Sequence, residues 1–282
     1  MTRTFRRLAG VLYAILLPAL LQATTTATVN RLYIFGDSYS DTGAGYIDGN
    51  GPTAAGYLAQ RLDLNLVPPS APNADENSIN FAVSGAGTGS NPGHRIKDAL
   101  LGLGMHDQVE DFVQRVGTGK IKFQPETTLF FIAGGLNDKR LPTKTTVTNL
   151  ETEVQMIYKA GGRRFLIALL PTSIPQFSEV GQRLDPAIAG IPSEMKSELP
   201  DASVSLSKWG PFFDEVMHNP AKYGITNTTD ACAGRAIFNQ DTTPCPDPAS
   251  HFYYHSGHPS TAVHKIVGDM LYQEVLKLPA PE

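Results

Sequence analysis

LYIFG, at residues 32–36, is a short apolar run that ends at a glycine. Three similar runs follow it: NFAV at 80–83, LFFIA at 129–133 and FLIALL at 165–170. Each stops at a serine, a glycine or a proline. Short runs with such sharp ends are typical of strands that are buried on both faces, although periodicity alone does not separate them from buried helical segments. The four runs therefore predict a buried parallel sheet.

Between these runs, apolar residues recur at the spacing of one helix face. The three sets are Val109, Phe112, Val113 and Val116; Val147, Leu150, Val154 and Ile157; and, after Pro259, Val263, Ile266, Val267, Met270, Leu271 and Val275. Alternation of buried strands and helices predicts the α/β class, as a three-layer α/β/α sandwich with a central, mostly parallel sheet. The proline-rich segment from 172 to about 207 has little periodicity, and we expect it to leave the sheet.

The first 27 residues have the pattern of a secretory signal peptide. Arg3, Arg6 and Arg7 precede an apolar run at 8–21, and small residues follow at Ala23 and Ala27, where cleavage is expected. The run is shorter than the roughly 20 apolar residues that span a bilayer, although a retained anchor is the alternative. The remaining residues, 28–282, are predicted to form one domain and to carry no stable membrane anchor.

Composition and cysteine usage agree with export. The net charge of −4 and the pI of about 6.0 give no reason to expect nucleic acid or an anionic membrane as a partner. Cys232 and Cys245 are an even pair in a loop-rich stretch, so we expect a disulfide in an oxidising compartment, two free buried thiols being the alternative. Asn227 begins an Asn-Thr-Thr glycosylation sequon, which is weak support for a secreted glycoprotein.

Residues just beyond the strands are where open parallel sheets bind ligands. GDSYSD, at 36–41, follows the first run and resembles the first sequence block of the GDSL (SGNH) hydrolases, with Tyr39 in place of leucine. Further stretches resemble later blocks in the expected order: NFAVSGA at 80–86, GLND at 135–138 and HPS at 258–260. The resemblance covers nearly all of the mature chain and implies a flavodoxin-like SGNH hydrolase fold and ester hydrolysis.

The resemblance also implies roles for four residues. Ser38 would be the nucleophile and His258 the base that takes its proton. The backbone N–H groups of Ser38 and Gly85 and the side chain of Asn137 would stabilise the oxyanion. Without the resemblance, these residues would be interpreted as a turn serine, a surface histidine, a turn glycine and a loop cap.

Several other acidic, glycine-rich and histidine-containing stretches are given no catalytic role. Asp37 and Asp41 are expected to hold the nucleophile's turn through backbone hydrogen bonds. GAGTG, at 85–89, places its third glycine one position too early for a dinucleotide fingerprint, and Gly-x-Ser-x-Gly occurs nowhere. Zinc binding by the histidines at 251, 255, 258 and 264 is disfavoured by Gly257 and Pro259, and His264 is expected at the surface or partly packed. We predict no metal and no other cofactor.

The resemblance fails at one position. GDSL hydrolases usually carry an aspartate three residues before the histidine, and here that residue is His255. One hypothesis is an active esterase that uses a Ser38–His258 dyad, helped by a carbonyl or by a carboxylate such as Asp247. The other is a non-catalytic descendant that binds a lipid or a glycan.

The substrate is expected to be a small-molecule or polymer-borne carboxylic ester. The C-terminal third of the chain resembles the lipase and acetylesterase branch of the family, so lipid esters and acetylated glycans both remain open as substrates. Acyl transfer in place of hydrolysis and the oligomeric state are also left open. If His255 merely fills the acid position, we expect the rate to fall below about pH 6.5 and a change of His255 to aspartate to raise kcat/KM.

Overall fold

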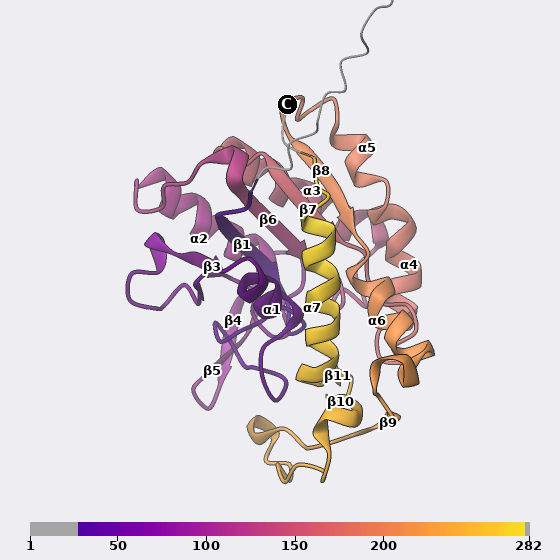
Figure 1. The fold of residues 1–282 in the computed structure, drawn as a ribbon. Helices are drawn as coiled ribbons and strands as arrows, with labels where there is room; N and C mark the ends of the chain where they lie inside the picture. Colours follow the sequence, from indigo (N-terminus) through magenta and orange to yellow (C-terminus); the bar gives the residue numbers. More distant parts are fainter. Residues whose placement is uncertain (1–27, 280–282) are drawn as a thin grey trace, which may run out of the picture.

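A computed structural model describes residues 28–279 and shows a six-stranded sheet with the strand order β2-β3-β1-β6-β7-β8 (Figure 1). Every neighbouring pair of strands in this sheet is parallel. The strands are β1 (Arg31–Gly36), β2 (Leu66–Val67), β3 (Ser78–Asn80), β6 (Thr128–Ala133), β7 (Arg164–Ala168) and β8 (Ser203–Ser207). Without the edge strand β2, the order is the 2-1-3-4-5 of flavodoxin-like folds, which confirms the predicted class. The predicted signal peptide, 1–27, lies outside the described residues.

Helices cover both faces of the sheet. α1 (Ala54–Arg61), α6 (Trp209–His218) and α7 (Thr261–Val275) pack together on one face. α2 (Met105–Gly117), α3 (Thr143–Lys159), α4 (Ser178–Ile188) and α5 (Ile191–Met195) lie on the other. The three predicted helices correspond to α2, α3 and α7, and the side chain of Ser260 caps α7 by accepting a hydrogen bond from the Val263 N–H. Among residues 28–279, no helix is long and apolar enough to cross a membrane.

Two sequence-based predictions about strands need correction. NFAV at 80–83 was expected to be a strand, yet β3 ends at Asn80. The Asn80 side chain accepts a hydrogen bond from the Ala82 N–H at 3.0 Å, which bends the chain out of the regular ladder. The segment 172–207 was expected to leave the sheet, yet it ends in β8. That strand is at the edge and alternates serine with apolar residues, so it lacks the apolar run of a central strand.

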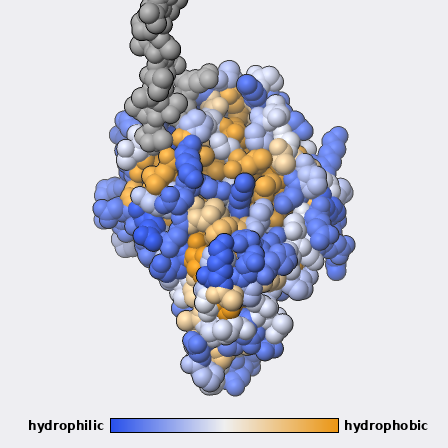
Figure 2. All heavy atoms as spheres, turned by 45° about the vertical axis from the view of Figure 1, so that its right-hand side comes forward, coloured by the Kyte–Doolittle hydropathy of each residue, from blue (hydrophilic) through white to orange (hydrophobic). Residues whose placement is uncertain are grey.

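Smaller elements gather at the lower end of Figure 1. β4 (Pro92–Ile96) and β5 (Ala99–Leu103) form an antiparallel hairpin, while β9 (Asn227–Ala231), β10 (His251–His255) and β11 (His258–Pro259) form a second sheet. Short 3₁₀ turns complete the chain: Ala74–Glu76, Pro125–Thr127, Pro220–Tyr223, Ala236–Phe238 and Pro248–Ser250. The segment between β9 and β10 forms a projection that is mostly hydrophilic at its surface (Figure 2).

A disulfide joins Cys232 to Cys245 and closes a loop in this projection, as the sequence predicts. We call residues 232–245 the disulfide loop. Asn227, the residue of the glycosylation sequon, begins β9, and its side-chain nitrogen donates to Asp230 at 2.9 Å.

Replacing both cysteines with serine should lower the free energy of unfolding by about 3 kcal/mol, because a cross-link across a short loop restricts the unfolded chain. Urea unfolding of the double variant, compared with the oxidised protein, measures this difference. An unchanged transition midpoint would show that the disulfide does not stabilise the folded protein against urea.

Candidate active site

The turn after β1 places Ser38 at the edge of the sheet. β1 lies between β3 and β6, where the strand order changes direction, and ligands of such sheets bind beyond the strand ends at this point. A Cβ on Gly36 would lie 2.5 Å from the carbonyl oxygen of Ala133, so only glycine lets the two strand ends approach this closely. Ser38 therefore leaves the sheet where a substrate can reach it.

Two carboxylates hold this turn, as the sequence predicts. Asp37 accepts a hydrogen bond from the Tyr39 N–H at 3.1 Å. Asp41 accepts bonds from the N–H groups of Gly43 at 2.8 Å and Ser84 at 2.9 Å, so it ties the first sequence block to the second. Burial raises the pKa of Asp37 to about 7 and the pKa of Asp41 to about 6. Both residues act on backbone groups and neither contacts His258.

Tyr39 links the nucleophile's turn to the turn that carries His258. Its hydroxyl donates to the carbonyl oxygen of Gly257 at 2.7 Å, and its ring packs against those of Trp209, Phe213 and His258. The ring is fully buried. A leucine, the usual residue of the family block, has no group that could make this hydrogen bond.

His258 begins β11, immediately after a tight turn at Gly257. Its Nε2 atom lies 2.8 Å from the Ser38 Oγ atom, although the two residues are 220 positions apart in the chain. The exposed fractions are 7% for Ser38 and 6% for His258, so both side chains are almost fully buried. The structure thus brings together the nucleophile and base that the sequence predicts.

Three residues that line the same cavity as this pair, or belong to it, carry hydrogen-bond donors: Ser38, Gly85 and Asn137. Gly85 has a φ of +82°, which only glycine adopts easily, and Asn137 donates one N–H to the Ala86 carbonyl oxygen at 2.9 Å. An amide NH₂ has two hydrogens, so the second N–H of Asn137 is left for a ligand. Within residues 28–279, no hydrogen bond occupies the backbone N–H of Ser38 or that of Gly85.

A cavity of about 330 Å³ contains Ser38, Gly85, Asn137 and His258. Its other walls come from hairpin β4–β5, the residue Phe177 and the disulfide loop. The Gly102 N–H on the hairpin donates to the Ser84 carbonyl oxygen at 2.8 Å, which fixes the hairpin next to Gly85. The predicted site residues therefore share one accessible space.

A carboxylate from the first loop of the chain approaches His258. Asp48 Oδ1 lies 2.7 Å from His255 Nδ1 and 2.8 Å from Arg235 Nε, and Asp48 Oδ2 lies 3.3 Å from His258 Nε2. On the other side of the ring, Arg235 Nη2 lies 2.6 Å from His258 Nδ1. His255, which replaces the usual aspartate, thus holds a carboxylate that comes from elsewhere in the chain.

Burial and charge set the protonation of these groups. Burial, with further lowering by the Arg235 charge, outweighs the Asp48 charge and lowers the pKa of His258 to about 4. Burial alone would raise the pKa of Asp48, but the His255 hydrogen bond and the charges of His258 and Arg235 leave that pKa lowered. At neutral pH, His258 is neutral and Asp48 is ionised.

Residues 32–271 match the family described as GDSL-like lipase/acylhydrolase. The chain belongs to this family. It is therefore related to hydrolases that act on esters.

Individual relatives are distant. Two GDSL esterase/lipases of Arabidopsis thaliana are 25% and 22% identical to this chain. The first alignment covers 86% of this chain and 82% of the relative, and the second covers 87% and 86%. Among solved structures, the psychrotrophic esterase EstA from Pseudoalteromonas sp. is 14% identical with a TM-score of 0.46, covering 88% of this chain and 97% of EstA. The protein YxiM from Bacillus subtilis is 12% identical with a TM-score of 0.49. Here the match covers 88% of this chain but only 56% of YxiM.

Two charged residues of this GDSL hydrolase site were missed by the sequence analysis. Asp48 lies in a glycine-rich loop and Arg235 in the disulfide loop, and neither loop has a pattern that places it near His258. Asp247, suggested as the substitute acid, is exposed, and its backbone oxygen lies 2.9 Å from His251 Nδ1. The carboxylate in contact with His258 is Asp48 instead.

The clustered histidines have different hydrogen-bond partners in the GDSL fold, although His255 and His258 both lie next to Asp48. His251 contacts the loop before β10, His255 contacts Asp48, and His258 contacts Ser38. His264 was expected at the surface or partly packed, but it is 3% exposed and its Nδ1 accepts a hydrogen bond from the Ala54 N–H at 3.1 Å. Burial lowers its pKa to about 3, so it is a neutral core residue.

In the part of the chain from 28 to 279, no group of three or more histidine, cysteine, aspartate or glutamate side chains is placed to hold a metal ion. The glycines at 85–89 lead into hairpin β4–β5 and not into a helix, whereas a dinucleotide-binding loop of this kind opens a helix.

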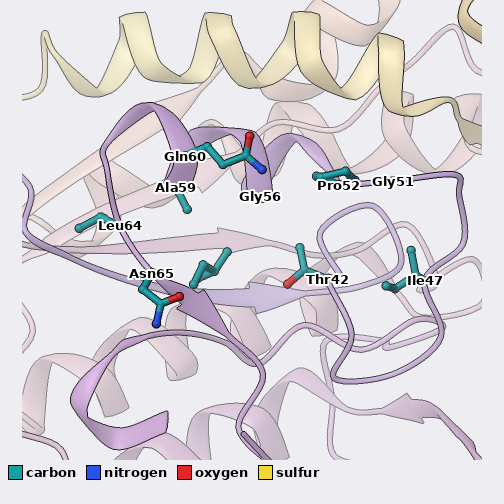
Figure 3. Close-up of a pocket in the computed structure, with 10 residues that line it drawn as sticks. Thr42, Ile47, Gly51, Pro52, Gly56, Ala59, Gln60, Leu64 and Asn65 are labelled. Atoms are coloured by element: carbon teal, nitrogen blue, oxygen red, sulfur yellow. The ribbon is translucent and has the colours of Figure 1, made fainter. Parts of the chain in front are cut away.

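A larger cavity of about 460 Å³ lies away from Ser38 (Figure 3). Gly56, Ala59 and Gln60 of α1 form one wall, and Thr42 and Ile47 lie across from them. No acidic or basic side chain lines it. It therefore lacks the groups that acyl transfer requires, and size alone does not identify the active site.

The acid limb of the pH profile of kcat/KM should lie near pH 4 and not near the pH 6.5 expected from the sequence, because His258 accepts a proton only while neutral and its pKa is about 4. Initial rates with a nitrophenyl ester measure this limb. Unfolded histidines bind protons at about pH 6.5, so stability also falls as the pH drops below that value, and circular dichroism must show a folded protein at each pH. A limb at about pH 6.5 in the folded enzyme would contradict the lowered pKa.

Proposed function

We propose that this protein hydrolyses carboxylic esters through an acyl-enzyme on Ser38. The observation that carries the proposal is the 2.8 Å contact between Ser38 Oγ and His258 Nε2 at the sheet edge. In the reaction, Nε2 takes the hydroxyl proton while Oγ attacks the ester carbonyl carbon. His258 then gives the proton to the leaving alcohol, and water releases the acid by the same steps in reverse order.

The oxyanion would form next to the three donors of the cavity. Ser38, Gly85 and Asn137 line the same cavity, and Asn137 uses only one of its two N–H groups, on Ala86. Their positions are fixed before the substrate arrives, because Gly85 lies against the hairpin and Asn137 is bonded to Ala86. Donors fixed in this way stabilise the developing charge at no further cost of reorganisation.

The acyl group is proposed to lie in the 330 Å³ cavity. Apolar side chains surround the reactive pair there: Ile96, Leu101, Phe177, Ile237 and Phe238. The alcohol part would leave toward solvent, so either a lipid or an acetylated glycan could supply the ester. Rates across acyl-chain lengths, measured with and without acetylated glycans, separate these two substrate classes.

We also propose that the enzyme acts outside the cell. The disulfide is a bond that persists in oxidising compartments, and the charged and apolar pattern of the first residues is that of a secretory signal. Extracellular lipids and cell-wall glycans would both be accessible to it there.

The competing hypothesis is a non-catalytic protein that binds an ester without cleaving it. One observation favours it, since an arginine and not a carboxylate lies at Nδ1 of His258. Such a protein would bind ligands in the same cavity, but it would show neither turnover nor covalent labelling of Ser38.

Ser38→Ala should abolish hydrolysis and leave the fold intact, because the change removes only the attacking oxygen. A fluorophosphonate should label the parent protein at Ser38, as located by peptide mass spectrometry, and should not label the variant. Labelling at another residue, or turnover that survives in the variant, would disprove the serine mechanism.

Asn137→Ala should reduce kcat about 10²–10³-fold with little change in KM, since the donor acts mainly on charge that develops in the transition state. Steady-state kinetics with a short-chain nitrophenyl ester would measure both constants. A rate equal to that of the parent enzyme would show that Asn137 only supports the loop through its bond to Ala86.

A further inference from the structure

A cation and a carboxylate lie on opposite sides of the His258 ring. The Arg235 cation lies at Nδ1, 2.6 Å away, and the Asp48 carboxylate lies 3.3 Å from Nε2, the nitrogen that faces Ser38. A serine hydrolase base needs the opposite arrangement. A carboxylate or carbonyl should accept a proton from Nδ1, so that Nε2 has a free lone pair for the serine proton.

The contact between Arg235 and His258 determines where the imidazole proton lies. A guanidinium carries only donors and stays charged in proteins, so at 2.6 Å it must donate to Nδ1. Nδ1 is then without a proton, and the neutral ring carries its proton on Nε2. In this tautomer Nε2 donates to Ser38 Oγ and cannot accept from it. The Asp48 carboxylate near Nε2 favours the same tautomer.

We propose that Arg235 is a positioning residue that holds His258 in its inactive tautomer, and that Ser38 becomes nucleophilic only when Arg235 leaves Nδ1. The proposal rests on the proposed serine mechanism, because it defines what limits that mechanism. Under this proposal, the disulfide loop controls whether His258 can act as a base. The oxyanion donors take no part in this control.

The change of tautomer conserves charge and protons. When Arg235 leaves, Nε2 loses its proton to a water molecule and Nδ1 gains one from water, so the ring stays neutral. The Ser256 carbonyl oxygen, 3.2 Å from Nδ1, then accepts the new Nδ1–H. Until then the same oxygen accepts from Arg235 Nη2 at 2.7 Å. The carbonyl thus has a partner in both states, and the freed Nε2 lone pair can take the Ser38 proton.

The disulfide loop holds Arg235 in place. The Arg235 N–H donates to Gln240 Oε1 at 2.8 Å within the loop, and the guanidinium pairs with Asp48 at 2.8 Å. At the tip, Lys97 of the hairpin β4–β5 connection donates to the Ala236 carbonyl oxygen and to Asn239 Oδ1. Ile237 and Phe238 of the loop line the cavity, so a bound acyl chain would touch the element that carries Arg235.

Nitrogen-15 NMR of the histidine-labelled protein at neutral pH tests the proposal directly. His258 is assigned by the signals that disappear in His258→Gln. In the parent protein, the protonated nitrogen of His258 should be Nε2. In Arg235→Ala it should be Nδ1, because the Ser256 carbonyl oxygen, 3.2 Å from Nδ1, no longer bonds Arg235 and outcompetes Asp48, 3.3 Å from Nε2. Arg235→Lys, which keeps a donor cation, should retain the Nε2 proton, and Arg61→Ala, which breaks an exposed arginine–aspartate pair elsewhere, should change nothing.

Kinetics give the second measurement. Arg235→Ala should raise kcat for a nitrophenyl ester by about tenfold, which is part of the roughly 10²–10⁴ that a positioned base contributes. Lys97→Ala, which frees the loop tip and leaves His258 untouched, should raise kcat by a smaller factor. This second variant keeps the proposal testable if the arginine variant fails to fold.

The outcomes separate this proposal from the proposed function. A proton on Nδ1 in the parent protein, or a lower kcat with an unchanged tautomer in Arg235→Ala, would overturn the control by Arg235. If a fluorophosphonate labels Ser38 in either case, the serine mechanism survives without this control. If neither the parent nor Arg235→Ala reacts with the probe, the serine mechanism fails and the proposal, which rests on it, fails too.

Discussion

The hydrogen bond from the Tyr39 hydroxyl to the Gly257 carbonyl oxygen joins the two ends of the candidate active site. Ser38 precedes Tyr39 and His258 follows Gly257, so this one bond links the turn that carries Ser38 to the turn that carries His258. Its donor is buried among Trp209, Phe213 and other rings, where water cannot compete for the hydroxyl. The 2.8 Å contact of Ser38 with His258 depends on this arrangement.

The loss of the usual aspartate has a structural consequence. His255 at that position bonds Asp48, and Asp48 in turn pairs with Arg235. A carboxylate is therefore still present beside His258, but it reaches the ring from the Ser38 side, and the cation takes the place of the acid. The pKa of His258, lowered to about 4 by burial and by Arg235, keeps the ring neutral at neutral pH, so its tautomer and not its charge decides whether it can act as a base.

Much of the fold could be predicted because its central strands are buried on both faces. The runs that became β1, β6 and β7 are continuously apolar, and α2, α3 and α7 have a clear apolar stripe. β8 was missed because an edge strand is only half-buried and keeps its serines. His264 was misplaced because nothing in a helical pattern shows that a polar residue will face the core and find a backbone donor.

The sequence by itself determined the order of the chemical groups. A glycine and a serine at the end of a central parallel strand must lie at the carboxyl edge of the sheet, and the family blocks supplied the histidine and the residues proposed as oxyanion donors. Only the tertiary structure decided which charges flank the histidine. Asp48 and Arg235 lie 187 positions apart on loops without periodicity, and such loops take their paths from packing and from a disulfide, not from local pattern.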